Sequence, residues 1–358
     1  MGLQPRGDTT TGWWVTGTTM TVVTIATIVG NSAVMLALWR VRRAPSHYPL
    51  TSLVMADLMV GLMVQPLAAV RELFVFNLNR NICSFWSTLD VLCCTASILS
   101  LCALGWERWS GITAPLSRAR RAKKARLLAV LVWPVATLVA LPNAFIPSPK
   151  HFHPGELEKA CAVNTNTGYV FFSITFSFYI PAVMLVIMYG YILQALSSPP
   201  TIRAHRGRTA TDQQAPPLPR SPKPQETDNN QNIRINVSPN NNLNLPHFAC
   251  TAETTGRCNI HENFLDRQRR ATRTIVMLMA LFLVCWTPYF IILPIDSLYD
   301  CIWENTWLWC TWLGYINSAL NPLVYAAASP SVRLALHSTL TTSSTRKAEI
   351  ELTPRVRR

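Results

Sequence analysis

The sequence predicts an all-α membrane protein, a bundle of seven transmembrane helices. Charged residues make up only 14% of the 358 residues, roughly half the globular average of about 25%, whereas hydrophobic residues make up 49%. The hydrophobic residues gather in seven blocks, and Lys and Arg gather at the joints between them. An ordinary cytosolic globular protein of this size would carry more surface charge.

Each apolar block is long enough to cross a bilayer as one helix, because a hydrocarbon layer of about 30 Å needs about 20 helical residues. The blocks are numbered spans 1 to 7 in chain order. They cover residues 13–39, 49–74, 83–107, 127–147, 169–195, 274–297 and 306–328. An odd number of spans puts the two termini on opposite sides of the membrane.

The charged joints predict the orientation. Basic residues follow spans 1 and 3 and precede span 6, whereas the joint before span 7 holds Asp300 and Glu304. The positive-inside rule then places the N-terminus outside the cell and the C-terminus in the cytoplasm. The net charge of +14 therefore indicates loops that face anionic lipid rather than a surface that binds nucleic acid.

Composition divides the chain into five parts. Residues 1–12 are polar, lack the pattern of a cleavable signal peptide and form an extracellular N-terminus. Spans 1 to 5 lie in 13–196, and spans 6 and 7 lie in 267–328. Between them, 197–266 is rich in Pro, Asn, Gln and Arg and is expected to be a disordered third cytoplasmic loop. Residues 329–358 form a cytoplasmic tail.

Ionisable residues inside apolar spans are costly and therefore mark functional sites. Asp90 and Arg108 share span 3, and their separation of roughly 27 Å along a helix puts them near opposite membrane surfaces. Glu107 can neutralise Arg108 locally. No Lys or Arg lies deep in another span, so we expect Asp90 to meet water or a ligand rather than a protein cation.

Asp57 in span 2 is accompanied by short polar side chains from three other spans. Their oxygen atoms could coordinate a small hard cation such as sodium. Alternatively, they form a hydrogen-bond cluster that only joins the helices. The accompanying residues are Asn31, Ser97, Asn317, Ser318 and Asn321.

Each span also carries a short motif, and the motifs follow one another in a recognisable order. They are Gly30-Asn31, Leu53-Val54-Met55-Ala56-Asp57, Cys83 with Glu107-Arg108-Trp109, Trp133, Pro181 with Tyr189, Cys285-Trp286-Thr287-Pro288 and Asn321-Pro322-Leu323-Val324-Tyr325. With these motifs the chain resembles a rhodopsin-like (class A) G-protein-coupled receptor over all seven spans. Glu107-Arg108-Trp109 stands where that family usually has Asp-Arg-Tyr.

The resemblance implies a multi-pass protein of the plasma membrane with a short amphipathic eighth helix after span 7. Pro330 fits the first turn of such a helix. It also implies that a heterotrimeric G protein docks at the cytoplasmic face around Arg108, and that arrestin and receptor kinases are further partners. No enzymatic activity is expected, and no cofactor beyond an allosteric sodium ion at Asp57, Ser97, Asn317 and Ser318.

The family pattern also assigns a disulfide and a set of residues that couple ligand binding to the G protein. The disulfide would join Cys83 to Cys161. The residues implied in activation are Glu107, Arg108, Trp109, Tyr189, Asn321, Pro322 and Tyr325.

A narrower resemblance is to biogenic-amine receptors. In that group an aspartate seven residues after the span 3 cysteine binds the ligand ammonium, and Asp90 follows Cys83 by that spacing. Tyr315 would hydrogen-bond to Asp90. The chemistry agrees, because a carboxylate in a low-dielectric cleft attracts a protonated amine and forms a charge-assisted hydrogen bond with it.

Ser173 and Ser177 are spaced i, i+4 and share one face of span 5, and the family resemblance implies that this face is turned toward the ligand. Two hydroxyls suit a catechol or phenol, so the preferred ligand is dopamine, octopamine, tyramine or an adrenergic amine, with serotonin as the alternative. The serines could instead bond to carbonyls of their own helix. The other expected ligand contacts are aromatic: Phe178, Trp286, Tyr289, Phe290, Trp312 and Tyr315.

Several alternatives stay open. The intramembrane carboxylates would also suit a cation-coupled transporter, although no inverted repeat is apparent, and a peptide or orphan receptor could use the same scaffold. Cys301 and Cys310 flank the joint before span 7 and could form a second disulfide. In the third loop, His247, Cys250, Cys258 and His261 could bind zinc, although their connecting segment is shorter than that of zinc fingers.

Overall fold

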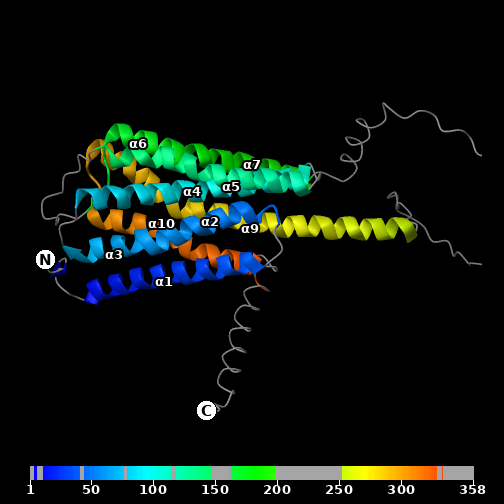
Figure 1. Cartoon of the computed structure of the whole chain (residues 1–358), viewed down its shortest axis with the longest axis horizontal. Coiled ribbons are helices and arrows are strands. Elements are labelled where there is room, and N and C mark those ends of the chain that lie inside the picture. Colours follow the sequence, from blue (N-terminus) through cyan, green and yellow to red (C-terminus); the bar gives the residue numbers. More distant parts are fainter. Residues whose placement is uncertain are drawn as a thin grey trace, which may run out of the picture. The chain divides into compact units, whose positions relative to one another are not determined.

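Helices account for nearly all of the described chain (Figure 1). The computed structural model describes residues 4–5, 11–40, 44–75, 79–113, 118–146, 161, 163–197, 252–328 and 333, with the backbone alone in 195–197 and 252–271. Helix α1 (Thr11–Arg40) forms span 1. Span 2 consists of α2 (His47–Met59), a π-helical turn η1 (Val60–Val64) and α3 (Gln65–Leu73).

The next three spans follow the same order as the apolar blocks. Span 3 is the single helix α4 (Arg80–Thr113). Span 4 is α5 (Arg118–Ala140), which ends in a 3₁₀ turn, η2 (Leu141–Ala144). Span 5 consists of α6 (Thr167–Ile174), a second π-helical turn η3 (Thr175–Tyr179) and α7 (Ile180–Ser197).

Spans 6 and 7 are α9 (Ala252–Tyr299) and α10 (Glu304–Ala328). Six of the described spans are long and apolar enough to cross a membrane by hydropathy alone. Helix α10 is less apolar because it carries Trp, Asn and Thr, yet its 25 residues reach about 37 Å, enough to cross the hydrocarbon layer. A short antiparallel pair, β1 (Gln4–Pro5) with β2 (Phe74–Val75), joins the N-terminal segment to the end of α3.

The start of α9 corrects one predicted boundary. The helix begins at Ala252, so residues 252–266 are helical and not part of a disordered loop. The Pro-rich and Asn-rich sequence ends near Pro246, and the following segment up to Asp266 contains no proline to interrupt a helix. The contacts nevertheless divide the chain into two compact units, of which one is residues 197–265. Residues 198–251, and the tail where an eighth helix was predicted apart from Arg333, lie outside the described residues.

Both π-helical turns lie just before a proline. Pro66 follows η1 and Pro181 follows η3. Proline has no N–H to donate, and its ring collides with the carbonyl four residues earlier. A π-helical turn widens the backbone at that point. Each turn therefore changes the direction in which the residues of the following helix, α3 or α7, point relative to the residues before the turn.

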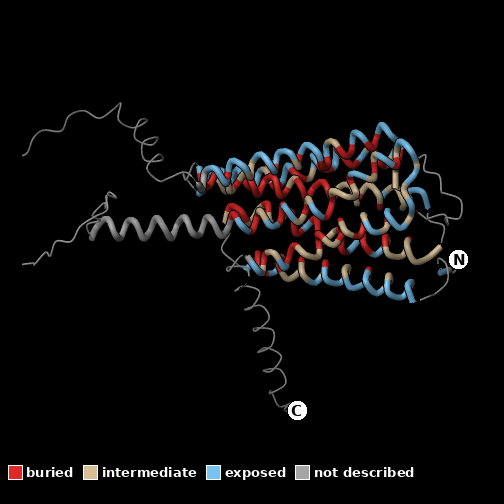
Figure 2. Tube along the Cα trace, turned by 180° about the vertical axis from the view of Figure 1, so that it is seen from behind, coloured by how far each residue is buried: buried red, intermediate tan, exposed pale blue. Residues whose placement is uncertain are grey.

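Burial separates the interior of the bundle from its perimeter (Figure 2). Large apolar side chains such as Val29, Leu138 and Val284 face outward and are more than 60% exposed. An apolar perimeter of this extent requires lipid around it. Inside, a methyl group added at Gly30 of α1 would come within 2.9 Å of Pro322 on α10, so the glycine permits the close approach of these two helices.

Candidate functional site

Asp90 on α4 is the carboxylate around which the candidate ligand site is built. Its Oδ2 atom accepts a hydrogen bond of 3.1 Å from the hydroxyl of Tyr315 on α10, the contact that the family resemblance implies. Its Oδ1 atom is buried and has no hydrogen-bond partner among the described residues. A buried carboxylate oxygen without a partner is costly, which makes this atom the acceptor that a cationic group would satisfy.

Two small cavities meet at Asp90. The outer cavity, of about 40 Å³, lies on the side of the disulfide and is also lined by Arg71, Trp86 and Tyr315. The inner cavity, of about 30 Å³, is also lined by Ser177, Trp286 and Phe290. Small-molecule pockets are usually roughly 300–1,000 Å³. A ligand therefore enters only if side chains around Asp90 move apart.

The serines of span 5 meet the site in different ways. Ser173 lines both cavities, and Ser177 lines the inner one. The Ser177 hydroxyl donates a hydrogen bond of 2.6 Å to the backbone carbonyl of Ser173. For Ser177, the structure thus shows the alternative in which a membrane serine bonds to its own helix. Its hydrogen is already used, although its oxygen can still accept.

Aromatic side chains close the inner cavity. Trp286 meets Tyr289 edge to face at 5.7 Å, and both line the cavity together with Phe290. Phe178 stacks on Phe290 at 4.2 Å without lining either cavity. Trp312 likewise lies behind the site, where it supports Tyr315 edge to face at 5.5 Å. Phe178 and Trp312 therefore support the expected contacts and do not line the cavities themselves.

Arg71 corrects the expectation that no protein cation lies near Asp90. This residue sits in the last turn of α3, is only 4% exposed and lines the outer cavity together with Asp90. It forms its ion pair with Glu72, at 2.8 Å, and its guanidinium lies over the ring of Trp86 at 4.8 Å. The charge of Arg71 is therefore balanced by Glu72, and Asp90 keeps Tyr315 as its hydrogen-bond partner.

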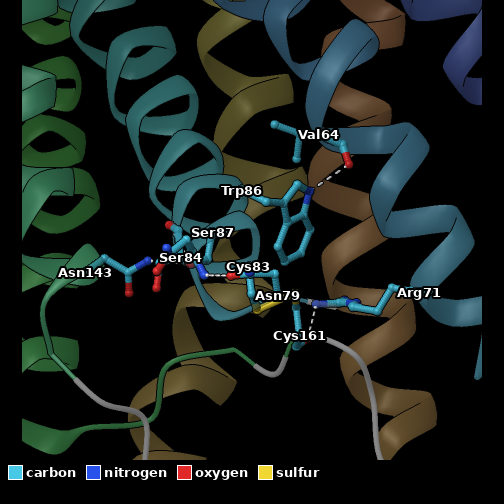
Figure 3. Close-up of a disulfide and its surroundings, with 10 residues drawn as sticks. Val64, Arg71, Asn79, Cys83, Ser84, Trp86, Ser87, Asn143 and Cys161 are labelled. Atoms are coloured by element: carbon cyan, nitrogen blue, oxygen red, sulfur yellow. Dashed lines mark hydrogen bonds between the residues drawn. A yellow bond between two sulfur atoms is a disulfide. The ribbon is translucent and has the colours of Figure 1, made fainter. Parts of the chain in front are cut away.

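The predicted disulfide between Cys83 and Cys161 is present (Figure 3). It fixes the segment before α6 to the start of α4. Figure 3 also shows the Arg71 guanidinium reaching across to donate a hydrogen bond of 3.0 Å to the Cys161 carbonyl. Cys301 and Cys310 are both free thiols, so the second disulfide does not form. The His247, Cys250, Cys258 and His261 pattern lies outside the residues whose side chains are described.

Asp57 is the fully buried centre of a second polar site. Its carboxylate accepts hydrogen bonds of 2.8 Å from Ser318, 2.8 Å from Asn321 and 3.4 Å from Ser97. These contacts join spans 2, 3 and 7, as the helix-joining alternative requires.

Two asparagines complete this polar site differently from expectation. Asn31 extends the network to span 1 by donating to the Ser318 carbonyl at 2.9 Å. Asn317 is buried without a hydrogen bond to Asp57, and its Oδ1 atom has no partner among the described residues. Among the predicted sodium-site residues, Ser97 and Ser318 therefore contact the carboxylate directly, and Asn321 joins them.

At the opposite end of α4, Glu107 is buried between two arginines. Its carboxylate lies 3.6 Å from Arg108 and 3.7 Å from Arg121, which comes from the start of α5. Trp109 beside them is 37% exposed. Of the other residues implied in activation, Tyr189 packs at the edge of the core and Tyr325 is buried.

Sequence analysis missed Gln65, which supports Tyr315, and Trp86, which lines the outer cavity. Gln65 is fully buried and donates weak hydrogen bonds to Thr27 (3.2 Å) and to the Tyr315 carbonyl (3.3 Å). Trp86 donates to the Val64 carbonyl at 3.0 Å and so connects α4 to the π-helical turn η1. Gln65 could have been identified from the sequence, because an uncharged polar residue inside an apolar span marks a buried polar contact. No sequence signal marks Trp86, because tryptophan is common throughout this sequence.

Comparison with known proteins agrees with this architecture. Residues 30–325 match the family described as 7 transmembrane receptor (rhodopsin family). The 5-hydroxytryptamine receptor 1D of Canis lupus familiaris is 30% identical over 338 residues, which cover 88% of this chain and 85% of that protein. The 5-hydroxytryptamine receptor 1B of Homo sapiens is 29% identical over 339 residues, with 89% and 84% covered.

Proposed function

Because the chain belongs to the rhodopsin family of seven-transmembrane receptors, and within it to the receptors for biogenic amines, we propose that it is a plasma-membrane receptor for 5-hydroxytryptamine (serotonin). The names of the relatives support serotonin, the alternative of the sequence analysis. They do not support the preferred catecholamine or phenolamine. Members of this family are receptors and not enzymes.

The observation that carries the proposal is the position of Asp90. Its Oδ1 atom is buried without a hydrogen-bond partner among the described residues, and both cavities reach this carboxylate. A primary ammonium would satisfy Oδ1 while Tyr315 continues to hold Oδ2. The flat aromatic part of the ligand would then extend into the inner cavity, beside Trp286 and Phe290.

The serines favour a ring with one hydroxyl over a ring with two. A catechol presents two neighbouring hydroxyls, and two serine donors would match them best. Here the Ser177 hydrogen is already donated to the Ser173 carbonyl, which leaves one of the two serine hydrogens committed to the helix. Ser173 lines both cavities and is the serine that we expect to meet the single hydroxyl of serotonin.

Signalling would use the opposite end of the bundle. We expect the N-terminus outside the cell and the C-terminus in the cytoplasm, so that Glu107 and Arg108 face the G protein. Binding at Asp90 would favour the state in which Arg108 leaves Glu107 and the cytoplasmic ends of the helices separate. A ligand shifts this equilibrium only by its different affinity for the two states. Arrestin and receptor kinases are proposed to act on the same active state.

Asp57 is proposed to bind an allosteric sodium ion between these two ends. Its carboxylate and the hydroxyl oxygens of Ser97 and Ser318 form a compact set of oxygen ligands. A sodium ion that binds only one state of the receptor would oppose any agonist that prefers the other state.

The proposal is tested by nucleotide exchange on a heterotrimeric G protein in membranes that contain the receptor. Serotonin, dopamine and octopamine are compared, with untransfected membranes as the control. We expect serotonin to stimulate exchange at the lowest concentration. A lower effective concentration for dopamine would contradict the serotonin assignment, and amine-dependent substrate flux without exchange would favour a transporter.

A further inference from the structure

Arg71 brings a second kind of charged group into the outer cavity. The side chain is buried, and its NH1 and NH2 atoms donate to the Cys161 carbonyl and to Glu72. Its Nε–H has no acceptor among the described residues. Asp90 lines the same cavity and presents the Oδ1 atom that lacks a donor. Two residues that line the outer cavity therefore carry one unsatisfied donor and one unsatisfied acceptor.

The charges around this cavity do not sum to zero. Arg71 and Glu72 form an ion pair of 2.8 Å and cancel one another, whereas Asp90 contributes a negative charge with only the neutral Tyr315 bonded to it. A ligand with one positive charge balances the site. A ligand with an additional carboxylate would leave a negative charge uncompensated in a low-dielectric environment, which is unfavourable.

From this geometry we infer that Arg71 forms a subsite for a neutral hydrogen-bond acceptor, a carbonyl oxygen, carried next to the ammonium of the ligand. The inference rests on the proposed function, since it assumes that the ammonium pairs with Asp90. It adds a second point of recognition. The ammonium satisfies Asp90, and the adjacent carbonyl accepts the Nε–H of Arg71. The subsite thus adds affinity for monocationic aromatic amines that carry an amide or ester beside the ammonium, in addition to the amines that Asp90 alone recognises.

Two probes with the same indole ring test this subsite. Tryptamine carries the ammonium alone, and tryptophanamide carries the ammonium and an adjacent amide carbonyl. Binding is measured by competition with radiolabelled tryptamine in membranes holding the full-length receptor, at about pH 6.5, where α-amino groups are protonated. We expect tryptophanamide to bind about tenfold more tightly, the factor that one hydrogen bond to a charged group contributes.

The variant Arg71→Met combined with Glu72→Gln removes both charges together and so avoids leaving Glu72 without its arginine partner. In this double variant we expect the affinity ratio of the two probes to fall to about one. Arg71 also supports the segment at Cys161 and the ring of Trp86, so the variant could weaken both probes. A purely structural role would weaken them equally. The ratio reports the subsite alone, and an unchanged ratio would overturn the inference.

The single variant Glu72→Gln is the matched control for charge. It keeps Arg71 but leaves the guanidinium without its carboxylate, so tryptophan, with its own carboxylate, should gain affinity relative to tryptophanamide. Tighter binding of tryptophan than of tryptophanamide to the unmodified receptor would contradict a neutral subsite.

The two proposals fail in distinguishable ways. Failure of tryptamine to bind the unmodified receptor, or equal binding to an Asp90→Asn variant, would overturn the amine site itself. Normal tryptamine binding that requires Asp90, together with a probe ratio indifferent to Arg71, would overturn the subsite alone.

Discussion

Replacing Asp90 by asparagine should abolish high-affinity amine binding and leave the fold intact. The asparagine has the same shape, and its carbonyl oxygen can still accept the Tyr315 hydroxyl that Oδ2 accepts at 3.1 Å. The negative charge and the unsatisfied Oδ1 acceptor are lost. Truncating one member of a buried charge pair costs about 2–5 kcal/mol of binding free energy. Serotonin affinity should therefore fall by roughly 30-fold to several thousand-fold.

The assay is saturation binding of radiolabelled serotonin, with surface expression measured on the same cells by an antibody against an N-terminal tag. Asp90→Glu is the matched variant, because it keeps the charge and moves it by one methylene group. It should retain more affinity than Asp90→Asn. Unchanged serotonin affinity in a normally expressed Asp90→Asn receptor would refute the reasoning.

Three further predictions concern the rest of the bundle. Sodium should weaken agonist affinity, and Asp57→Asn should abolish that effect; an unaltered salt response, compared with a choline control, would contradict the cation site. Glu107→Gln should raise basal nucleotide exchange by releasing Arg108, whereas Arg121→Gln should lower it by leaving Glu107 to Arg108 alone; equal basal rates would count against this switch. Gly314→Ala should lower the free energy of unfolding by about 1–3 kcal/mol, because the added methyl group would lie 2.9 Å from the Trp286 ring. An unchanged melting temperature of the purified receptor would contradict this prediction and show that the ring moves freely.

Apolar length and the cost of buried charge made much of this structure predictable. A block of about 20 apolar residues has few alternatives to a membrane helix, and a carboxylate inside one needs a partner. These two arguments placed the spans and selected Asp57 and Asp90. The contact between Tyr315 and Asp90 came from resemblance to a family, because no rule of spacing relates residues on different helices.

Other features depended on helix phase and on partners that the sequence does not reveal. The π-helical turn η1 adds about one residue to span 2 and so shifts the phase of α3 by roughly 100°. The direction of Arg71 could not be extrapolated across that turn. Adjacent charged residues at the end of a span are ordinarily solvated, whereas the side chains of Arg71 and Glu72 are both buried in the structure. The sequence also does not determine whether the Ser177 hydroxyl bonds to its own helix or to a ligand, and only the structure shows its bond to the Ser173 carbonyl.

The start of α9 illustrates a different limit. Low hydrophobicity marks a segment that does not enter the membrane, but it does not distinguish a disordered loop from a polar helix. Residues 252–266 are polar and helical. Sequence composition therefore predicted where apolar span 6 begins, but not the residue at which the longer helix α9 begins.

A cryo-electron microscopy structure of the receptor with serotonin and a G protein would test the role of Asp90 most directly. It should show the amine nitrogen of serotonin about 2.7–2.9 Å from a carboxylate oxygen of Asp90, the distance of a charge-assisted hydrogen bond. The indole should lie beside Trp286 and Phe290, in an inner cavity larger than the present 30 Å³. If the amine nitrogen of serotonin binds another residue and Asp90 contacts only Tyr315, the proposed role of Asp90 is contradicted.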